Sequence, residues 1–142
     1  MLVDDTSLKH RFTFKKAERL SSKKLIDELF KNGSFFILYP FKVQWMETTR
    51  AHTSPVQVLM SVPNRNFPDA VDRNRIRRCM RESYRHGKHL LYETLIPQHK
   101  KLILAIIYTA KRPEPFDVID KKIHSILKRL AETNGPSQQD IR

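Results

Sequence analysis

The stretch "LILAIIY" at residues 102–108 is a continuous apolar run of strand length. It is much shorter than the roughly 18 apolar residues that a membrane-spanning helix needs. A run that is apolar on both sides of the backbone is typical of a strand buried on both faces of its sheet. Residues 102–108 are therefore predicted to form the central strand.

Three further strand candidates precede this run, at 35–39, 41–47 and 56–62, and all are rich in aromatic or branched residues. Pro40 cannot donate to a sheet ladder, so it separates the first two strands or marks an edge. The second strand alternates between two faces. One face carries Phe41, Val43 and Trp45, and the other carries Lys42, Gln44 and Met46.

Three helices are predicted from periodicity and from start and stop signals. The first follows the N-capping pair Ser21–Ser22 and ends at Lys31–Gly33. The second spans about 70–92 and has an acidic capping pair, Asp69 and Asp72, at its start, while Gly87 weakens its later turns. The third spans about 116–133 and ends at "NG".

The resulting order, α-β-β-β-α-β-α, predicts an α/β two-layer sandwich with about four strands in a mixed sheet and three helices. A chain of 142 residues fits a single domain, 1–142. Residues 1–19 show no periodicity and are predicted to be an irregular basic arm. Residues 134–142 are predicted to be a disordered tail.

A formal net charge of +12 predicts a polyanionic partner, which charge alone leaves open as nucleic acid, anionic membrane or acidic protein. The single cysteine, Cys79, excludes an internal disulfide and a cysteine zinc cluster, and it fits a reducing compartment. With no apolar span and no secretory signal pattern at the N-terminus, the sequence predicts a soluble cytoplasmic protein.

The second helix contains "DRNRIRRCMRESYR" at 72–85, with six arginines and no lysine. At about 100° per residue, the apolar residues Ile76, Cys79, Met80 and Leu90 gather on one side. The basic face opposite holds Arg73, Asn74, Arg77, Arg78, Arg81, Arg85 and Lys88. Arg75 and Glu82 lie off this face, and Arg78 and Glu82 have the spacing of an ion pair.

A solvated surface is the simplest interpretation of a basic helix. However, like charges repel at i,i+4, and Arg73, Arg77, Arg81 and Arg85 stack four of them. Lysine would solubilise equally well, whereas the planar guanidinium binds phosphate bidentately and stacks on bases. The pattern therefore favours RNA or DNA binding.

The motif "RNRIRRCMRESYR" (73–85) resembles the signature helix of the bacterial ribonuclease P protein subunit. "FKKAERLSSKKLIDELFKNG" (14–33) and "SVPNRNFPDAVDRNRIRR" (61–78) agree with it, and the likeness runs from about residue 14 to 130. The resemblance implies a ribosomal protein S5 domain 2-like fold. It also implies a subunit that joins a catalytic RNA and helps it remove the 5′ leader of precursor tRNA, leaving the mature 5′ end.

The same resemblance implies specific site residues. Contacts with the catalytic RNA are expected at Arg73, Asn74, Arg75, Arg77, Arg78, Arg81 and Arg85. A leader-binding cleft between the first helix and the sheet is expected from Phe14, Ile26, Phe30, Phe41, Val43 and Arg65. Auxiliary basic contacts are expected from Lys15, Lys16 and Arg19. Gln44 and Asn64 depart from the family, which commonly has an aromatic residue and a lysine there.

No catalytic or metal-binding residue is predicted in the protein, because its acids are scattered and His86 and His89 lack a third ligand. The resemblance implies that magnesium ions and the hydrolysis belong to the RNA and that the partners are this RNA and precursor tRNA; no obligate protein partner is inferred. The alternative hypothesis is a non-catalytic RNA- or DNA-binding module, such as a ribosome-associated protein. A membrane-surface protein is disfavoured because no apolar helix face is left for lipid.

Overall fold

The computed structural model describes residues 13–49 and 54–136. The helices are α2 (Lys23–Asn32), α3 (Ala70–Gly87), α4 (His89–Leu95) and α5 (Phe116–Thr133), with 3-10 turns η1 (Lys16–Glu18) and η2 (Ile96–Gln98). The strands are β1 (Ser34–Leu38), β2 (Phe41–Glu47), β3 (Val56–Ser61) and β4 (Leu102–Tyr108). The predictions for residues 1–12 of the arm and 137–142 of the tail lie outside the described residues.

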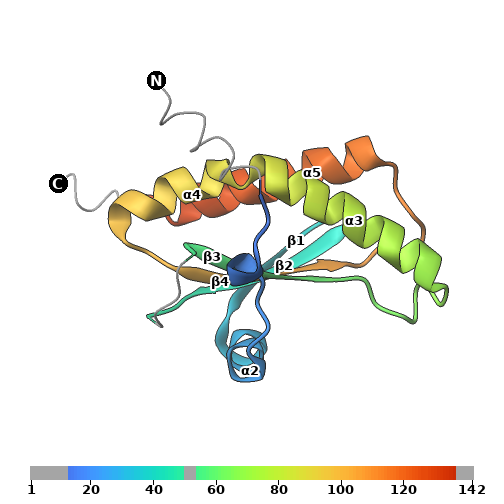
Figure 1. Ribbon diagram of the computed structural model, residues 1–142, viewed down its shortest axis with the longest axis horizontal. Coiled ribbons are helices and arrows are strands. Elements are labelled where there is room, and N and C mark those ends of the chain that lie inside the picture. The colour runs from blue at the N-terminus through green and yellow to red at the C-terminus, as the bar shows by residue number, and fades with distance from the viewer. Residues whose placement is uncertain (1–12, 50–53, 137–142) are drawn as a thin grey trace.

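The four strands form one mixed sheet in the order β1-β2-β4-β3 (Figure 1). β4 lies inside the sheet, antiparallel to β2 and parallel to β3, as its continuous apolar sequence predicts. β1 and β2 form a hairpin across Tyr39–Pro40, so the proline does separate two strands. The predicted α/β sandwich with a mixed sheet is therefore confirmed.

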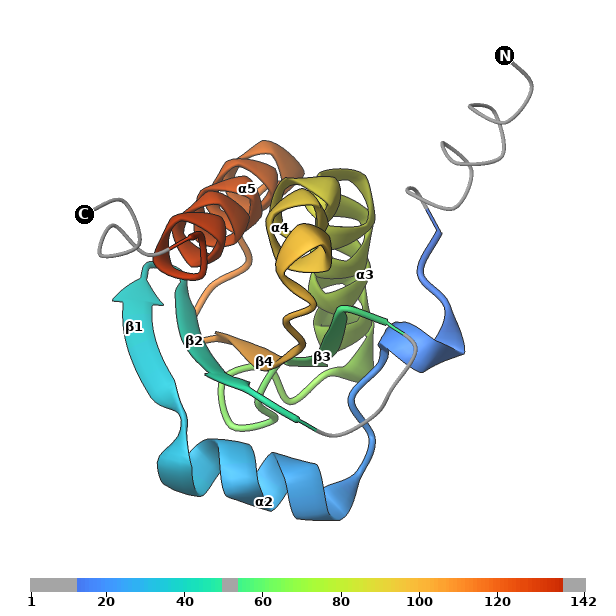
Figure 2. The ribbon, with the colours of Figure 1, turned by 90° about the vertical axis from the view of Figure 1, so that its left-hand side faces the viewer.

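The helices cover the two faces of the sheet unequally. In Figure 2, α3, α4 and α5 lie above the sheet and α2 lies alone below it. The sandwich therefore has one face closed by three helices and another covered by a single helix.

The described residues form four helices rather than the predicted three, because the segment predicted as one helix over 70–92 divides at Lys88.

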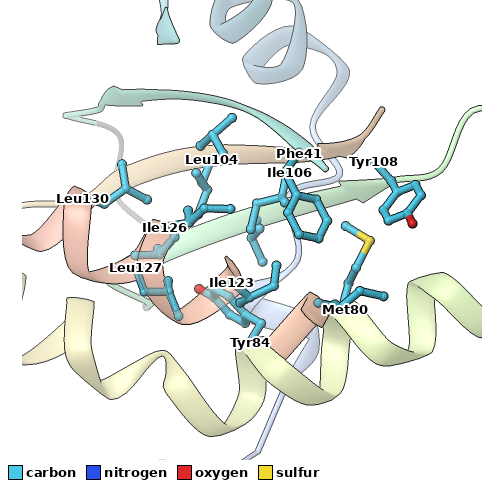
Figure 3. Packing of buried hydrophobic residues seen from close by; sticks show 14 of the residues in the cluster. Phe41, Met80, Tyr84, Leu104, Ile106, Tyr108, Ile123, Ile126, Leu127 and Leu130 are labelled. Atoms are coloured by element: carbon cyan, nitrogen blue, oxygen red, sulfur yellow. The ribbon is translucent and has the colours of Figure 1, made fainter. Parts of the chain in front are cut away.

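The closed face holds the larger hydrophobic core. Figure 3 shows side chains of α3 and α5 meeting those of the strands, among them Met80, Tyr84, Ile123, Phe41 and Ile106, all completely buried. A second, smaller cluster lies under α2, where Leu25 and Leu29 pack on Ile103 and Ala105 of β4. β4 therefore supplies alternate residues to both cores, which is why it is apolar throughout.

The seam between α3 and α5 requires a glycine. A Cβ on Gly87 would lie 2.2 Å from Cδ2 of His124 and 3.1 Å from Cδ1 of Leu127. One turn earlier, the Ser83 hydroxyl donates to the Asp120 carboxylate at 2.7 Å. Gly87, predicted from sequence as a weak point of the helix, instead allows α5 to approach α3 closely.

Two local predictions need correction. Asp69 is the N-cap residue of α3 but makes no side-chain capping hydrogen bond, so its contribution there is limited to its negative charge. Asn134, predicted to begin a disordered tail, is 4% exposed. Its side-chain amide donates to the Leu130 carbonyl at 2.9 Å, and its own carbonyl accepts from the Gln98 amide at 2.8 Å.

Candidate nucleic-acid interface

The arginines of α3, apart from Arg75, lie on the side of the helix that faces away from the core. Ile76, Met80 and Tyr84 anchor the opposite side and are completely buried. Because the buried side fixes the rotation of the helix, the basic side is held toward solvent. The sequence prediction of an apolar seam and a basic face is confirmed for this helix.

Not all of these arginines are equally available. The Arg73 guanidinium donates to the carbonyls of Phe67 at 2.8 Å and Pro68 at 2.7 Å. It therefore also stabilises the loop between β3 and α3. Arg77 donates to the Asn74 side chain at 3.2 Å. Within residues 13–49 and 54–136, neither a hydrogen bond nor an ion pair engages the exposed side chains of Arg75, Arg78 and Arg81.

The predicted Arg78–Glu82 ion pair is wrong. Glu82 instead accepts from Arg85 at 2.6 Å and lies 3.1 Å from Nε2 of His86. The hydrogen bond from Arg85 lowers the pKa of the Glu82 carboxyl. Arg78 therefore remains available for an external anion, while Arg85 is already engaged with an acid of its own helix.

The described part of the basic arm lies beside α3. Arg19 forms an isolated bridge to Val58 of β3, which adds the arm to the free edge of the sheet (Figure 2). Lys15, Lys16 and Arg19 are all exposed. The structure therefore brings the predicted auxiliary basic residues to the α3 side of the molecule.

Lys88 is the exception among the basic residues predicted to face solvent. It is 2% exposed, and its ammonium lies 2.5 Å from Oε1 of Glu18, which is 6% exposed. The backbone of Lys88 keeps the helical conformation, so the helical wheel fails here because the arm, through Glu18 and Thr13, covers the Lys88 side chain. Sequence reasoning missed this buried pair, since neither residue carries a local signal of burial.

The residues predicted to line one cleft are divided between the two faces of the sheet. Phe41 and Val43 are completely buried in the core under α3 and α5, and Phe14 packs edge-on against Tyr84 at 5.7 Å between ring centroids. Ile26 of α2 packs in the smaller cluster on the other side. Because side chains alternate along a strand, Phe41 and Val43 cannot line a surface beside α2.

The α2 side of the sheet offers a different set of residues. Strand pairing aligns Ile37 with Lys42, Lys42 with Ile107, and Ile107 with Ser61, so these four side chains share one face. Phe35 lies in the next row on the same face, opposite Gln44. The surface that we call the open face consists of Phe35, Ile37, Lys42, Ser61 and Ile107.

The open face is bordered by two of the predicted cleft residues, Ile26 and Phe30, which lie four positions apart on α2. Phe30 is 44% exposed, Phe35 60% and Ile37 65%, so large apolar side chains meet solvent here. Arg65 is exposed in the link that follows β3. The alternation of β2 was the signal that could have selected Lys42 in place of Phe41 and Val43.

In the described part of the chain, no group of three or more His, Cys, Asp or Glu residues is arranged to hold a metal ion. Nor does any helix in those residues combine the length and apolarity needed to cross a membrane.

Comparison with known proteins identifies the family. The model of the ribonuclease P family matches residues 14–131, which include the arm next to α3, the arginine helix and most of α5. The chain belongs to the ribonuclease P protein family. The family match decides between the two function hypotheses in favour of the first: this is a protein component of ribonuclease P, the endonuclease that processes the 5′ end of tRNA.

Individual relatives align with most of the length of this chain. The ribonuclease P protein component of Porphyromonas gingivalis is 31% identical over 126 residues, covering 89% of this chain and 91% of the relative. That of Chlorobium phaeobacteroides is 30% identical over 132 residues, covering 85% and 90%. The two relatives therefore match far more of the chain than the arginine motif alone.

Solved structures share the fold at lower identity. The ribonuclease P protein of Thermotoga maritima superposes with a TM-score of 0.63 at 21% identity, covering 79% of this chain and 96% of the other. A mutant of the Staphylococcus aureus ribonuclease P protein superposes with a TM-score of 0.65 at 21% identity, covering 80% and 88%. These likenesses confirm the architecture.

Proposed function

We propose that this chain binds the catalytic RNA of ribonuclease P through α3 and the basic arm, and holds the 5′ leader of precursor tRNA on its open face. It thereby assists magnesium-dependent removal of the leader. The observation that carries the proposal is the exposed set of Arg75, Arg78 and Arg81, which lack intramolecular partners among the described residues, on a helix fixed by its buried side.

The contact with the catalytic RNA rests on charge and geometry. Guanidinium groups without intramolecular partners leave their donors for phosphate oxygens, to which they bind bidentately. Each neutralised phosphate releases condensed counterions, and this release favours association at moderate salt. By neutralising phosphates where RNA strands meet, the protein also lowers the concentration of magnesium needed to fold and hold the complex.

The contact with the leader rests on the open face. Phe30 and Phe35 present exposed rings on which unpaired bases can stack, and such stacking contributes about 1 to 3 kcal/mol per base with little sequence preference. Lys42 supplies a positive charge in the same surface. A platform with these properties suits a single strand whose sequence varies from one precursor to another.

The hydrolysis itself is assigned to the RNA. Among the described residues, no group of three or more His, Cys, Asp or Glu side chains is arranged to hold a metal ion, and Glu18, Glu82 and Asp120 are each engaged by another side chain. This donor set does not fit a pair of magnesium ions held by the protein. The protein therefore contributes binding and positioning to the reaction. A cytoplasmic location remains a prediction.

A reconstituted cleavage assay tests the proposal. The catalytic RNA is incubated with precursor tRNA at limiting magnesium, with and without this chain, and release of the leader is measured. The protein is expected to lower the magnesium concentration required for half-maximal cleavage. An identical magnesium dependence with and without the protein would refute the assisting role.

Variants locate the contact with the RNA. Arg78→Ala and Arg81→Ala are each expected to weaken binding to the catalytic RNA and to reduce the slope of log affinity against log salt by about 0.7 to 0.9. Lys128→Ala removes the same charge from an exposed position of α5 and serves as the matched control. Equal losses for all three variants would mean that only the net charge matters and that α3 is not the contact.

A further inference from the structure

A buried polar network ties the basic arm to the junction of α3 and α4. Oε1 of Glu18 accepts from the Lys88 ammonium at 2.5 Å and from the Tyr92 hydroxyl at 2.7 Å, while Oε2 accepts from the backbone N–H of Lys15 at 2.8 Å. The Lys88 ammonium also donates to the carbonyl of Thr13. We call Glu18, Lys88 and Tyr92 the arm clamp.

Stability alone is a weak reason for such a network. Burying an ion pair costs desolvation energy that its attraction barely repays, and apolar residues of similar volume often stabilise as well or better. The hydrogen bonds of a buried pair do, however, fix geometry closely. Here they join positions 70 residues apart in the chain, so the clamp determines where the arm lies relative to α3.

The residue that follows the clamp on the arm is Arg19. Its backbone is fixed to β3, since Leu20 N–H donates to the Val58 carbonyl at 2.9 Å. Its guanidinium lies 5.3 Å from the centroid of the Phe14 ring, and that ring packs edge-on against Tyr84 of α3. The arm therefore directs the Arg19 charge toward α3.

On α3, Arg81 lies one turn before Tyr84 and one turn after Arg77. Partial desolvation of the Arg81 guanidinium, followed by the neighbouring charges of Arg19 and Arg77, lowers the pKa of Arg81. The fold thus gathers three positive charges whose mutual repulsion is unfavourable in the free protein. A bound anion would relieve that repulsion.

We propose that Arg19, Arg77 and Arg81 form one binding site for a phosphate of the RNA backbone, and that the arm clamp positions Arg19 in this site. The inference rests on the proposed binding of the catalytic RNA and deepens it, because it joins two segments of the chain into a single contact. Arg19 is then a binding residue, and Glu18 and Lys88 are positioning residues that do not touch the RNA.

A double-mutant cycle tests the shared site with the clamp intact. Arg19→Gln and Arg81→Gln are made singly and together, and affinity for the catalytic RNA is measured across a salt series. Each single variant is expected to weaken binding roughly three- to tenfold. The double variant is expected to lose less than the product of the two factors, and its salt slope is expected to fall by about one contact rather than two.

The matched control pairs Arg19→Gln with Arg75→Gln, which removes an exposed arginine of the same helix that lies off the basic face. These two effects should multiply, because they concern separate contacts. Multiplicative losses for Arg19 and Arg81, with a salt slope reduced by two contacts, would overturn the shared site.

The positioning role is tested with Glu18→Gln/Lys88→Met, which replaces the buried pair by uncharged side chains of similar length. In this background Arg19→Gln is expected to weaken RNA binding less than twofold, because the guanidinium is no longer held in place. Tyr92→Phe removes only one hydroxyl from the clamp and provides a milder background if the double replacement fails to fold. A full-sized Arg19 effect in a folded clamp variant would overturn the positioning role.

The outcomes separate this inference from the proposed function. If the unmodified protein neither binds the catalytic RNA nor lowers the magnesium requirement, the proposed function fails. If it does both and Arg78→Ala still weakens binding, but Arg19 and Arg81 act independently, only the composite phosphate site fails.

Discussion

The two faces of the sheet are built from the same strands and differ in what covers them. On the closed face, α3, α4 and α5 bury Phe41 and Val43 of β2 completely. On the open face, α2 covers only part of the surface, and Ile37 and Phe35 of β1 remain more than half exposed. Consecutive side chains of β2 thus lie on opposite faces of the sheet.

This difference separates stability from binding. Apolar side chains on the closed face are withdrawn from water on folding, and each contributes about 1.5 to 3 kcal/mol in this way. Exposed rings on the open face contribute little to folding, yet they are the side chains that can gain on contact with a base. Substitutions on the two faces should therefore affect different measurements.

The largest effect is expected for Phe41→Ala on the closed face. Its ring is completely buried and packs edge-on against Tyr108 at 5.6 Å between centroids, so truncation leaves a cavity. The free energy of unfolding should fall by about 3 to 5 kcal/mol, measured by urea denaturation. If stability were nearly unchanged and leader affinity fell instead, Phe41 would belong to the leader site after all.

A smaller loss of stability is expected for Gly87→Ala in the seam between α3 and α5. The added methyl group would overlap the His124 ring, and overpacking of this kind costs about 1 to 3 kcal/mol. The gain in helix propensity, at most about 1 kcal/mol, offsets only part of this loss. Thermal unfolding of Gly87→Ala with and without His124→Ala provides the check, because removing the ring should recover most of the loss.

Sequence reasoning was accurate for features set by local periodicity. The strand 41–47, the helix 116–133 and the central strand 102–108 agree with the structure. It was less accurate for the site, because the face that a residue occupies depends on which helices cover that face. Phe41 and Val43 were assigned to the leader cleft through resemblance, although their alternation with Lys42 had already separated two faces of the strand.

The arm clamp shows a second limit of sequence reasoning. Glu18 and Lys88 are ordinary charged residues in sequence, and Lys88 even falls on the basic face of an extended helical wheel. Only the docking of the arm brings the two side chains together. A contact between residues so distant in the chain leaves no periodic signal in a single sequence.

On the open face, Phe35→Ala is expected to spare stability and reduce leader binding. Its ring is 60% exposed, so the free energy of unfolding should change by no more than about 0.5 kcal/mol. The affinity advantage of precursor over mature tRNA, measured with the reconstituted enzyme, should shrink by about 1 to 3 kcal/mol if one base stacks there. Phe116→Ala, which truncates a 43% exposed ring at the start of α5, is the matched control and should leave that advantage intact.

The smallest effect is expected for Lys42→Met, which keeps the length of the side chain and removes its charge. The Lys42 ammonium lies 5.1 Å from the centroid of the Phe35 ring, and losing this contact should cost no more than about 1 kcal/mol of stability. If the leader backbone passes over the open face, the salt slope of leader-dependent affinity should fall by about 0.7, as expected for one contact with a single strand. Lys42→Arg retains the charge and should keep the slope. A slope unchanged by Lys42→Met, alongside a loss of affinity in Phe35→Ala, would mean that the open face stacks bases without contacting their phosphates.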